Sequence, residues 1–299
     1  MNNEKKLKAM AFGEILWDVF DNKKKIGGAP LNVVLRMKSF GCDATVISSV
    51  GNDEDGSAIL NEVKALGIKT DGIIQSDSFP TGVVQVTLDK SGSATYNINY
   101  PAAWDKIEIN DFALNSVSHA DVLIYGSLAC RDAVSRKSLE LLLRSDTYKV
   151  FDVNLRKPHY SYEILDRLML AADFIKFNDD EILEIATALQ SPFITLEENI
   201  HFIASRTNTA SICVTKGKDG ALLLWEGELH KNEGYTVQIA DTVGAGDSFL
   251  ASLITSLLTG KSPQTAIDFA CAVGALVAAS FGANPEISLV EVDKLINDR

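Results

Sequence analysis

Short apolar runs rich in β-branched residues alternate along the chain with longer segments whose apolar residues recur at helical spacing. Runs of the first kind predict buried strands, and segments of the second kind predict amphipathic helices. The predicted strands are Ala44–Val50, Asp121–Tyr125, Lys149–Val153, Asp173–Phe177 and Ser211–Thr215, and the helices between them include Ser57–Ala65, Ser135–Leu143 and Tyr162–Ala171. This alternation is typical of βαβ units, so we expect an α/β fold with a mostly parallel sheet flanked by helices.

One stretch departs from that alternation. Side chains alternate along Thr81–Asp89 and Ala94–Asn99, and the turn residues Asp89-Lys90-Ser91-Gly92 lie between them. The pattern predicts a β-hairpin. A hairpin early in a parallel α/β chain does not belong to the main sheet, so we expect a small flap outside it.

Near the C-terminus a glycine turn leads into two helices. The residues from Asp241 to Phe249 read DTVGAGDSF, and apolar residues recur at helical spacing from there to Gly260. Ser262 followed by Pro263 is a typical helix start and opens a second apolar helix that reaches about Ser280.

The glycine turn is a candidate anion site. Gly244 and Gly246 permit a tight turn, and the amides of residues 244 to 247 lie at a helix N-terminus, where free N–H groups and the dipole favour an anion. Asp247 would repel a bound phosphate, but it suits a phosphoryl group in transfer if the carboxylate accepts the proton of the attacking hydroxyl. The alternative is that Asp247 only caps the helix. A Walker A loop is absent, and Phe249 stands where a Rossmann fingerprint needs its third glycine.

Composition and charge narrow the class of protein. The 299 residues are 46% hydrophobic and 23% charged, which is ordinary globular usage, and no repeat or linker divides them, so we expect a single domain over residues 1–299. The net charge of −12 argues against nonspecific binding of nucleic acid or of an anionic membrane. The four cysteines form no CxxC pair, which argues against a zinc site. Acidic residues interrupt the first apolar stretch, and no uncharged run is long enough to span a membrane, so we expect a cytoplasmic protein.

The segment DTVGAGDSF closely resembles the C-terminal signature of the ribokinase-like (PfkB) carbohydrate kinases, usually written DTxGAGD. The Gly-Gly signature of that family is met by GGAPLN, from Gly27 to Asn32. Further segments resemble the family's GxDxxG, NxxE and TxGxxG motifs, namely Gly51–Gly56, Asn178–Glu181 and Thr215–Gly220. The resemblance covers nearly the whole chain and implies a ribokinase-like fold with a β-strand lid at about residues 12–26 and 80–104.

The resemblance implies ATP-dependent transfer of the γ-phosphoryl group to a hydroxymethyl group of a small polyol. Asp247 would be the base, and the amides of Gly244, Ala245 and Gly246 would stabilise charge on the migrating phosphoryl group. Retention of this set argues against the rival interpretation, a non-catalytic sugar or nucleotide sensor, because a sensor does not need the base.

For the nucleotide and the ions, the resemblance points to three segments. Asn178 and Glu181 would organise Mg²⁺ through its waters, although the two residues are also a plausible capped helix start. Thr215, Gly217 and Gly220 would lie near the ATP phosphates, together with Asn178. The family often binds a monovalent cation, and Asp241 and Val243 stand at the matching start of a K⁺ site, with Gly282 and Ala283 at its matching end.

For the sugar, the resemblance points to Asp18, Gly28 and Asn32, although Asp18 alone resembles a surface aspartate. Pro30, with the segment DVNLR that contains Asn154 and Arg156, is more like the fructokinase branch than ribokinase itself. Arg156 either faces the phosphates or pairs with a carboxylate.

Trp104 stands in the predicted lid and has two interpretations. It forms an apolar wall beside the sugar, or it is buried where two lids meet in a homodimer, since an exposed flap edge invites pairing. We expect a sugar kinase acting on fructose, the alternatives being ribose, 2-keto-3-deoxygluconate, a nucleoside or a phosphorylated hexose.

Overall fold

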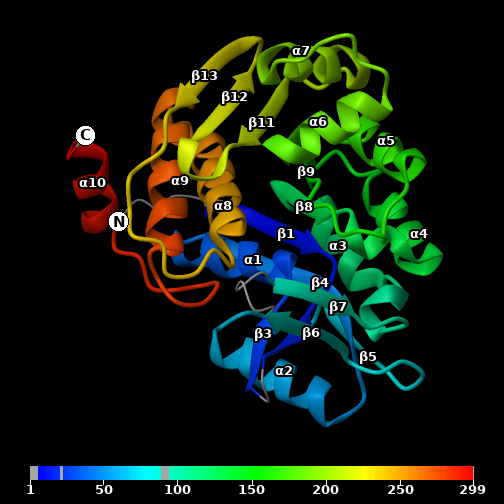
Figure 1. Ribbon diagram of the computed structural model, residues 1–299. Coiled ribbons are helices and arrows are strands. Elements are labelled where there is room, and N and C mark those ends of the chain that lie inside the picture. The colour runs from blue at the N-terminus through cyan, green and yellow to red at the C-terminus, as the bar shows by residue number, and fades with distance from the viewer. Residues whose placement is uncertain (1–5, 21–22, 89–93, 299) are drawn as a thin grey trace.

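A computed structural model of the chain describes residues 6–20, 23–88 and 94–298, and within them the larger of two sheets has nine strands (Figure 1). Their order across the sheet is β13-β12-β11-β10-β9-β8-β1-β4-β5. The strands are β1 (Lys8–Phe12), β4 (Asp43–Gly51), β5 (Ile73–Ser76), β8 (Val122–Gly126), β9 (Tyr148–Asp152), β10 (Phe174–Asn178), β11 (Ser211–Thr215), β12 (Ala221–Trp225) and β13 (Glu228–Asn232). Neighbours from β5 to β11 are parallel, and β12 and β13 continue the sheet antiparallel, so the predicted mostly parallel sheet is confirmed.

Helices cover both faces of this sheet (Figure 1). The first face carries α1 (Ala29–Ser39), α8 (Ala245–Leu258) and α9 (Pro263–Ala278), and the second carries α3 (Asp111–Ser118), α4 (Ala133–Leu142), α5 (Tyr162–Leu170), α6 (Asp179–Ala188) and α7 (Leu196–Thr207). Strand side chains alternate between the faces, so Val150 belongs to the core under α8 whereas Phe151 belongs to the core on the other side. Helix α2 (Glu54–Ala65) packs against β4, and α10 (Leu289–Asn297) packs against α9.

The smaller sheet has the order β3-β2-β6-β7 and lies beside the main body of the molecule (Figure 1). Its strands are β2 (Leu16–Phe20), β3 (Lys23–Gly27), β6 (Gly82–Leu88) and β7 (Ala94–Ile98). Strands β6 and β7 pair antiparallel, which confirms the predicted hairpin, while the predicted turn at residues 89–92 lies outside the described residues. Strand β2 joins this hairpin by pairing parallel to β6, so both predicted lid segments contribute to one sheet.

The carboxyl ends of the parallel strands open on one edge of the main sheet. Asp152, Asn178 and Thr215 are the last residues of β9, β10 and β11, and helices α1 and α8 are the two that carry the Gly-Gly and GAGD segments. In open α/β sheets this edge is where ligands bind. Within the described residues, no helix has the length and apolar character needed to cross a membrane.

Candidate active site

The glycine turn forms the start of α8. Gly244 is the N-cap residue with φ 77°, and a Cβ built there would lie 2.4 Å from the carbonyl oxygen of Ala283, so the position requires glycine. Gly246 lies in the first helical turn, where the backbone N–H groups have no acceptor within the helix. The turn therefore presents donors and the positive end of the helix dipole to an anion.

Asp247 is held at this turn by a relay of two side-chain amides. Asn32 Nδ2 donates to Asp247 Oδ2 at 2.8 Å, and Asn284 Nδ2 donates to Asn32 Oδ1 at 2.8 Å. Within the described residues, the side chain of Asp247 makes no helix-capping hydrogen bond, so the capping alternative does not describe it. Burial, and then the charge of Asp152, raise the pKa of Asp247 to about 6. The carboxylate is thus ionised at neutral pH and more basic than an exposed aspartate.

Both glycines of the Gly-Gly segment are explained by close contacts, with a side chain at Gly27 and with the backbone at Gly28. A Cβ on Gly27 would lie 2.2 Å from Asp18 Oδ2, and a Cβ on Gly28 would lie 2.2 Å from the carbonyl oxygen of Glu14. Gly28 also has φ 112°, which other residues rarely adopt. The segment thereby lets the Asp18 carboxylate turn toward the N-terminus of α1, where Asn32 lies. Burial raises the pKa of Asp18 to about 6.

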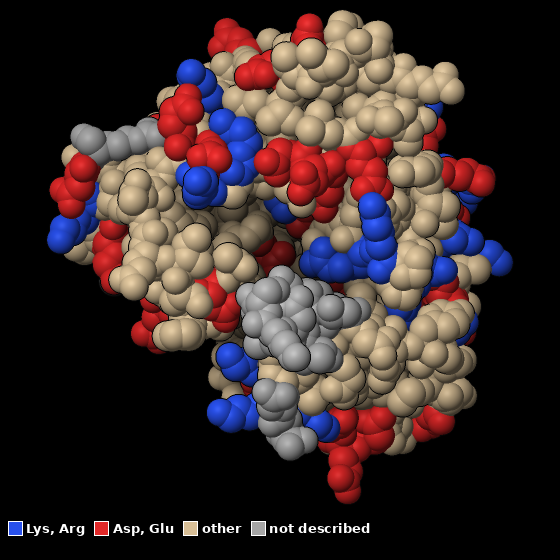
Figure 2. Space-filling view, in the orientation of Figure 1, with Lys and Arg blue, Asp and Glu red and all other residues tan. Residues whose placement is uncertain are grey.

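Arg156 faces this group of carboxylates from the loop after β9. Its positive charge lowers the pKa values of Asp18 and Asp247, opposing burial. Arg156 is exposed, donates from Nη1 to the carbonyl oxygen of Leu155 at 3.0 Å, and forms no ion pair with another described residue. Whether Arg156 contacts an anion stays a prediction. The face of the molecule seen in Figure 2 has a hollow with acidic and basic side chains around it.

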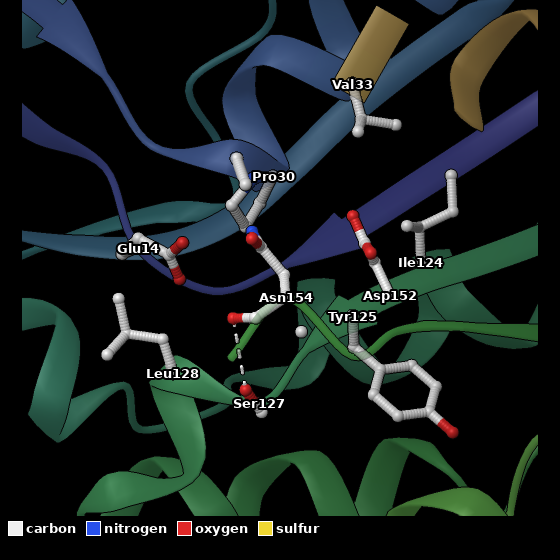
Figure 3. A pocket seen from close by; sticks show the side chains of 11 residues that line it. Glu14, Pro30, Val33, Ile124, Tyr125, Ser127, Leu128, Asp152 and Asn154 are labelled. Carbon is white, nitrogen blue, oxygen red and sulfur yellow. Dashed lines mark hydrogen bonds between the residues drawn. The ribbon is translucent and has the colours of Figure 1, made fainter. Parts of the chain in front are cut away.

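A small cavity lies next to the sugar-binding candidates. Glu14, Pro30, Ser127, Asp152 and Asn154 are among its lining residues (Figure 3). Asn154 has φ 38°, a left-handed conformation that asparagine tolerates better than most residues. Ser127 Oγ donates to the carbonyl oxygen of Asn154 at 3.5 Å. The predicted substrate residue Asn154 thus lines the same cavity as Glu14 and Pro30, and its contact with a sugar stays a prediction.

Asn178 and Glu181 form a capping box at the start of α6. Asn178 Oδ1 accepts from Glu181 N at 2.7 Å, and Glu181 Oε2 accepts from Asn178 N at 2.8 Å. Glu181 Oε1 accepts from Leu155 N at 2.8 Å. Each carboxylate oxygen keeps a second lone pair, so the group fits a Mg²⁺ ion held through its waters, and that role stays a prediction.

The predicted nucleotide segment follows β11, which pairs with β10 so that Thr215 lies opposite Asn178. Gly217 has φ 56° and nothing within 4 Å of a built Cβ, so the turn is open at that residue. A Cβ on Gly220 would lie 2.0 Å from the carbonyl oxygen of Asn232, so this glycine shapes the turn. The ATP contacts stay a prediction.

The two segments of the predicted K⁺ site meet in space. Asp241 Oδ1 accepts from Val243 N at 3.0 Å, and Asp241 Oδ2 accepts from Gly282 N at 3.1 Å. Ala283 in turn contacts Gly244. The cation itself stays a prediction.

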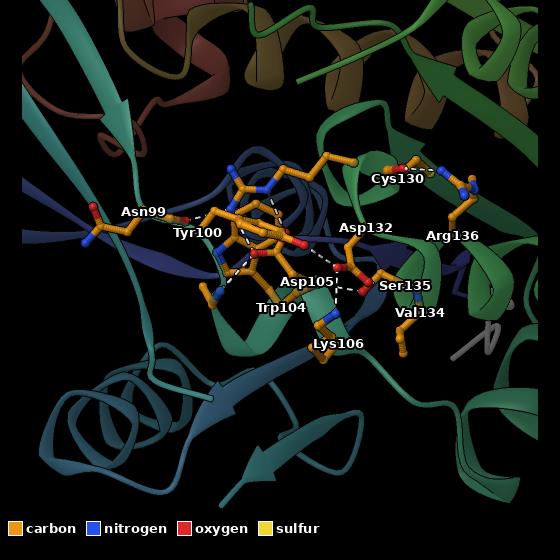
Figure 4. A network of polar contacts seen from close by, with 12 residues as sticks. Asn99, Tyr100, Trp104, Asp105, Lys106, Cys130, Asp132, Val134, Ser135 and Arg136 are labelled. Atoms are coloured by element: carbon orange, nitrogen blue, oxygen red, sulfur yellow. Dashed lines mark hydrogen bonds and ion pairs between the residues drawn. The ribbon is translucent and has the colours of Figure 1, made fainter. Parts of the chain in front are cut away.

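Trp104 is not brought to this cluster. It lies on a short 3₁₀ helix, η1 (Ala103–Lys106), with no exposed surface, and the guanidinium of Arg131 stacks 4.2 Å from its ring centre (Figure 4). Arg131 also donates from Nε and Nη2 to the buried carboxylate of Asp105. Trp104 is therefore part of the core of this chain, where neither a sugar nor a second lid touches it in this conformation.

Three charged residues at the site were not predicted. Glu14 follows β1 with 6% of its surface exposed, and burial raises its pKa to about 7. Lys176 and Asp152 form a buried ion pair at 2.9 Å. The available signal was a charged residue inside or beside an apolar run that predicts a buried strand, since such residues are rarely buried without a reason.

Comparison with known proteins gives the same picture of the fold. Residues 2–288 match the family model described as pfkB family carbohydrate kinase. A fructokinase of Escherichia coli is 29% identical over 273 residues, which cover 86% of this chain and 87% of that protein. Among solved structures, a fructokinase of Xylella fastidiosa with bound ATP has a TM-score of 0.83 at 22% identity, covering 97% of this chain and 98% of that one. A 2-dehydro-3-deoxygluconokinase of Thermotoga maritima has a TM-score of 0.85 at 20% identity, covering 97% and 99%.

Proposed function

Because the chain belongs to the pfkB family of carbohydrate kinases, we propose that it transfers the γ-phosphoryl group of ATP to a primary hydroxyl of a small sugar, and that this sugar is fructose. The observation that carries the proposal is the carboxylate of Asp247, held by Asn32 beside the open amides of α8. A base next to an anion site is what phosphoryl transfer to a hydroxyl requires.

In the proposed reaction, Asp18, Gly28 and Asn32 bind the sugar so that one hydroxyl reaches Asp247. Asp247 takes the hydroxyl proton while the oxygen forms a bond to the γ-phosphorus. The bond from that phosphorus to the bridging oxygen breaks, and its electron pair leaves with ADP. The amides of residues 244 to 246 stabilise the charge on the phosphoryl oxygens. A base so placed contributes roughly 100- to 10,000-fold in rate.

The remaining site residues bind and orient the nucleotide. Thr215, Gly217 and Gly220 would border the ATP phosphates, and Asn178 and Glu181 would hold a Mg²⁺ ion through its waters. When bound, Mg²⁺ neutralises part of the phosphate charge. A K⁺ ion beside Asp241 and Val243 would add a positive charge behind the same turn. Bound ATP in the Xylella fastidiosa fructokinase supports the choice of nucleotide.

Fructose is supported by the fructokinase of Escherichia coli and by the Pro30 and DVNLR segments. The Thermotoga maritima neighbour, by contrast, is a 2-dehydro-3-deoxygluconokinase. Turnover of fructose and turnover of 2-keto-3-deoxygluconate are therefore the two rates to compare first.

The test is ADP release with Mg-ATP against a panel of fructose, ribose, glucose, 2-keto-3-deoxygluconate, adenosine and the fructose 1- and 6-phosphates, with and without K⁺. Turnover that depends on fructose supports the proposal in full. Preference for another member keeps the kinase and replaces the sugar. Trace release that is the same with every sugar, in a folded sample that binds ATP, would contradict the kinase and favour a sensor.

A further inference from the structure

A buried ion pair lies beneath the glycine turn. Lys176 and Asp152 are directly opposed in the register of β10 and β9, with Nζ and Oδ1 at 2.9 Å. Their side chains are 8% and 6% exposed. By strand alternation they point, like Val150 and Phe174, to the face that α8 covers. A buried ion pair contributes little net stability compared with apolar residues of similar size, so stability alone does not account for it.

The ammonium group of Lys176 lies against the anion turn. A Cβ built on Gly246 would have Lys176 Nζ as its neighbour at 3.5 Å, in ordinary van der Waals contact. An ammonium has three N–H donors, and Asp152 Oδ1 accepts one of them. A phosphoryl group at the amides of this turn therefore lies within reach of a buried positive charge in a chain whose net charge is −12.

Asp152 decides where that charge is held. The ammonium of Lys176 donates to the Asp152 carboxylate, with Nζ and Oδ1 at 2.9 Å, so the positive charge has a fixed partner. Among the described residues, its ion-pair partner within 4 Å is Asp152 and not Asp247. Asp152 keeps the ammonium beside the turn and leaves the base without a salt bridge.

We propose that Lys176 is a further catalytic residue that contacts the transferred phosphoryl group, and that Asp152 is its positioning residue. The proposal rests on the proposed kinase function. During transfer the sugar oxygen bonds to the γ-phosphorus, the bond to the ADP oxygen breaks with its electron pair, and the hydroxyl proton goes to Asp247. Lys176 keeps its proton throughout and stabilises charge on the oxygens in flight.

The principal variant removes both charges together. Lys176→Met alone leaves the Asp152 carboxylate buried without a partner and risks the fold, whereas the double variant Lys176→Met/Asp152→Asn leaves no unpaired charge. We expect the double variant to unfold near the parent temperature and to lose about 100- to 1000-fold in kcat, as for loss of one oxyanion donor, with the KM for sugar little changed. A loss of no more than about threefold in kcat, far smaller than the expected loss, would overturn the proposal.

Lys149 supplies the matched control. It is paired at 3.8 Å with Asp173, the residue before β10, and lies near the end of β9 opposite Asp152, away from the glycine turn. We expect Lys149→Met to keep the parent kcat. An equal loss in this variant would show that the effect of Lys176 is structural and would contradict the proposal.

Asp152→Asn tests the positioning role through the pH profile. Asn32 donates a hydrogen bond to Asp247. The charged groups that interact electrostatically with Asp247 are Asp152, Lys176, Arg156, Glu14 and Asp18. The charge of Asp152 raises the pKa of Asp247, so removing that charge lowers this pKa. Removal also frees Lys176 from its ion pair, and the charge of Lys176 lowers the pKa of Asp247 further. The acid limb of kcat/KM should therefore move to lower pH. A reduced rate with an unmoved limb would contradict positioning.

Binding of ADP with aluminium fluoride, a mimic of the phosphoryl group in flight, tests the contact without turnover. We expect the double variant to bind this complex at least about tenfold more weakly and ADP alone equally well. If the parent protein phosphorylates no sugar, the proposed function fails, and this binding ratio still decides the role of Lys176. The proposed role of Lys176 would be overturned if the double variant bound both ligands more weakly by the same factor, or bound both as tightly as the parent does.

Discussion

Glu14→Gln should stabilise the protein in a pH-dependent manner. The Glu14 side chain lines the cavity beside α1, and burial raises its pKa from 4.5 to about 7 (Figure 3). Below pH 4.5 the carboxyl group is protonated in both the folded and the unfolded chain. Between 4.5 and 7 the unfolded chain ionises while the folded chain does not, so the contribution of Glu14 to stability falls as pH rises.

The size of the effect follows from the two pKa values. The interval from 4.5 to about 7 corresponds to about 3 kcal/mol at 25 °C. Glutamine does not ionise and keeps one oxygen to accept the backbone hydrogen bond from Ala29. We therefore expect Glu14→Gln to match the parent near pH 4 and to exceed its unfolding free energy by up to about 3 kcal/mol at pH 8.

Urea unfolding at pH values from 4 to 8, followed by tryptophan fluorescence, measures this difference. Glu62→Gln, at a partly exposed position of α2, is the control and should stay within about 0.5 kcal/mol of the parent at every pH. A difference that is independent of pH, or a Glu14→Gln variant less stable than the parent at pH 8, would refute the reasoning.

Three further predictions concern the glycine turn. Asp247→Asn should lower kcat at least about a hundredfold while ATP still binds, because only the transition state needs the base, and activity within about tenfold of the parent would contradict that role. In the parent, kcat/KM should fall as pH drops through about 6, where the raised pKa of Asp247 lies, and a flat profile down to pH 5 would count against it. Gly244→Ala should destabilise the fold much more than Gly246→Ala in thermal unfolding, because only Gly244 combines a positive φ with a backbone atom 2.4 Å from the built Cβ. Equal melting temperatures would contradict the turn geometry.

Much of the fold could be predicted from the sequence because the helices and parallel strands follow simple hydrophobic patterns. Strand β11 has the predicted bounds, and α9 begins at Pro263 after the predicted cap Ser262. The antiparallel pair β12 and β13 was not predicted. Its turn places Glu226 at φ 50° and Gly227 at φ 89°, the left-handed pair that a two-residue hairpin needs, and Glu-Gly is a weaker sequence signal for it than Asn-Gly.

The candidate site was predictable where a motif carries it and not where burial does. Asp247, Asn32 and Gly244 lie together because their motifs sit at the ends of α1 and α8. Lys176 and Asp152 become neighbours only through the register of two strands that are separated by helix α5. The burial of Trp104 also depends on a distant residue, Arg131, which covers its ring, and local sequence does not report such packing.

Phosphorus NMR of the protein mixed with Mg-ATP and fructose tests the central claim most directly. The account predicts that the γ-phosphate signal of ATP disappears as ADP and a sugar phosphate ester appear in equal amounts. The chemical identity of the ester would show which hydroxyl reacts, and Asp247→Asn should form it at least about a hundredfold more slowly. Inorganic phosphate in place of the ester, or equal rates for the parent and Asp247→Asn, would contradict the account.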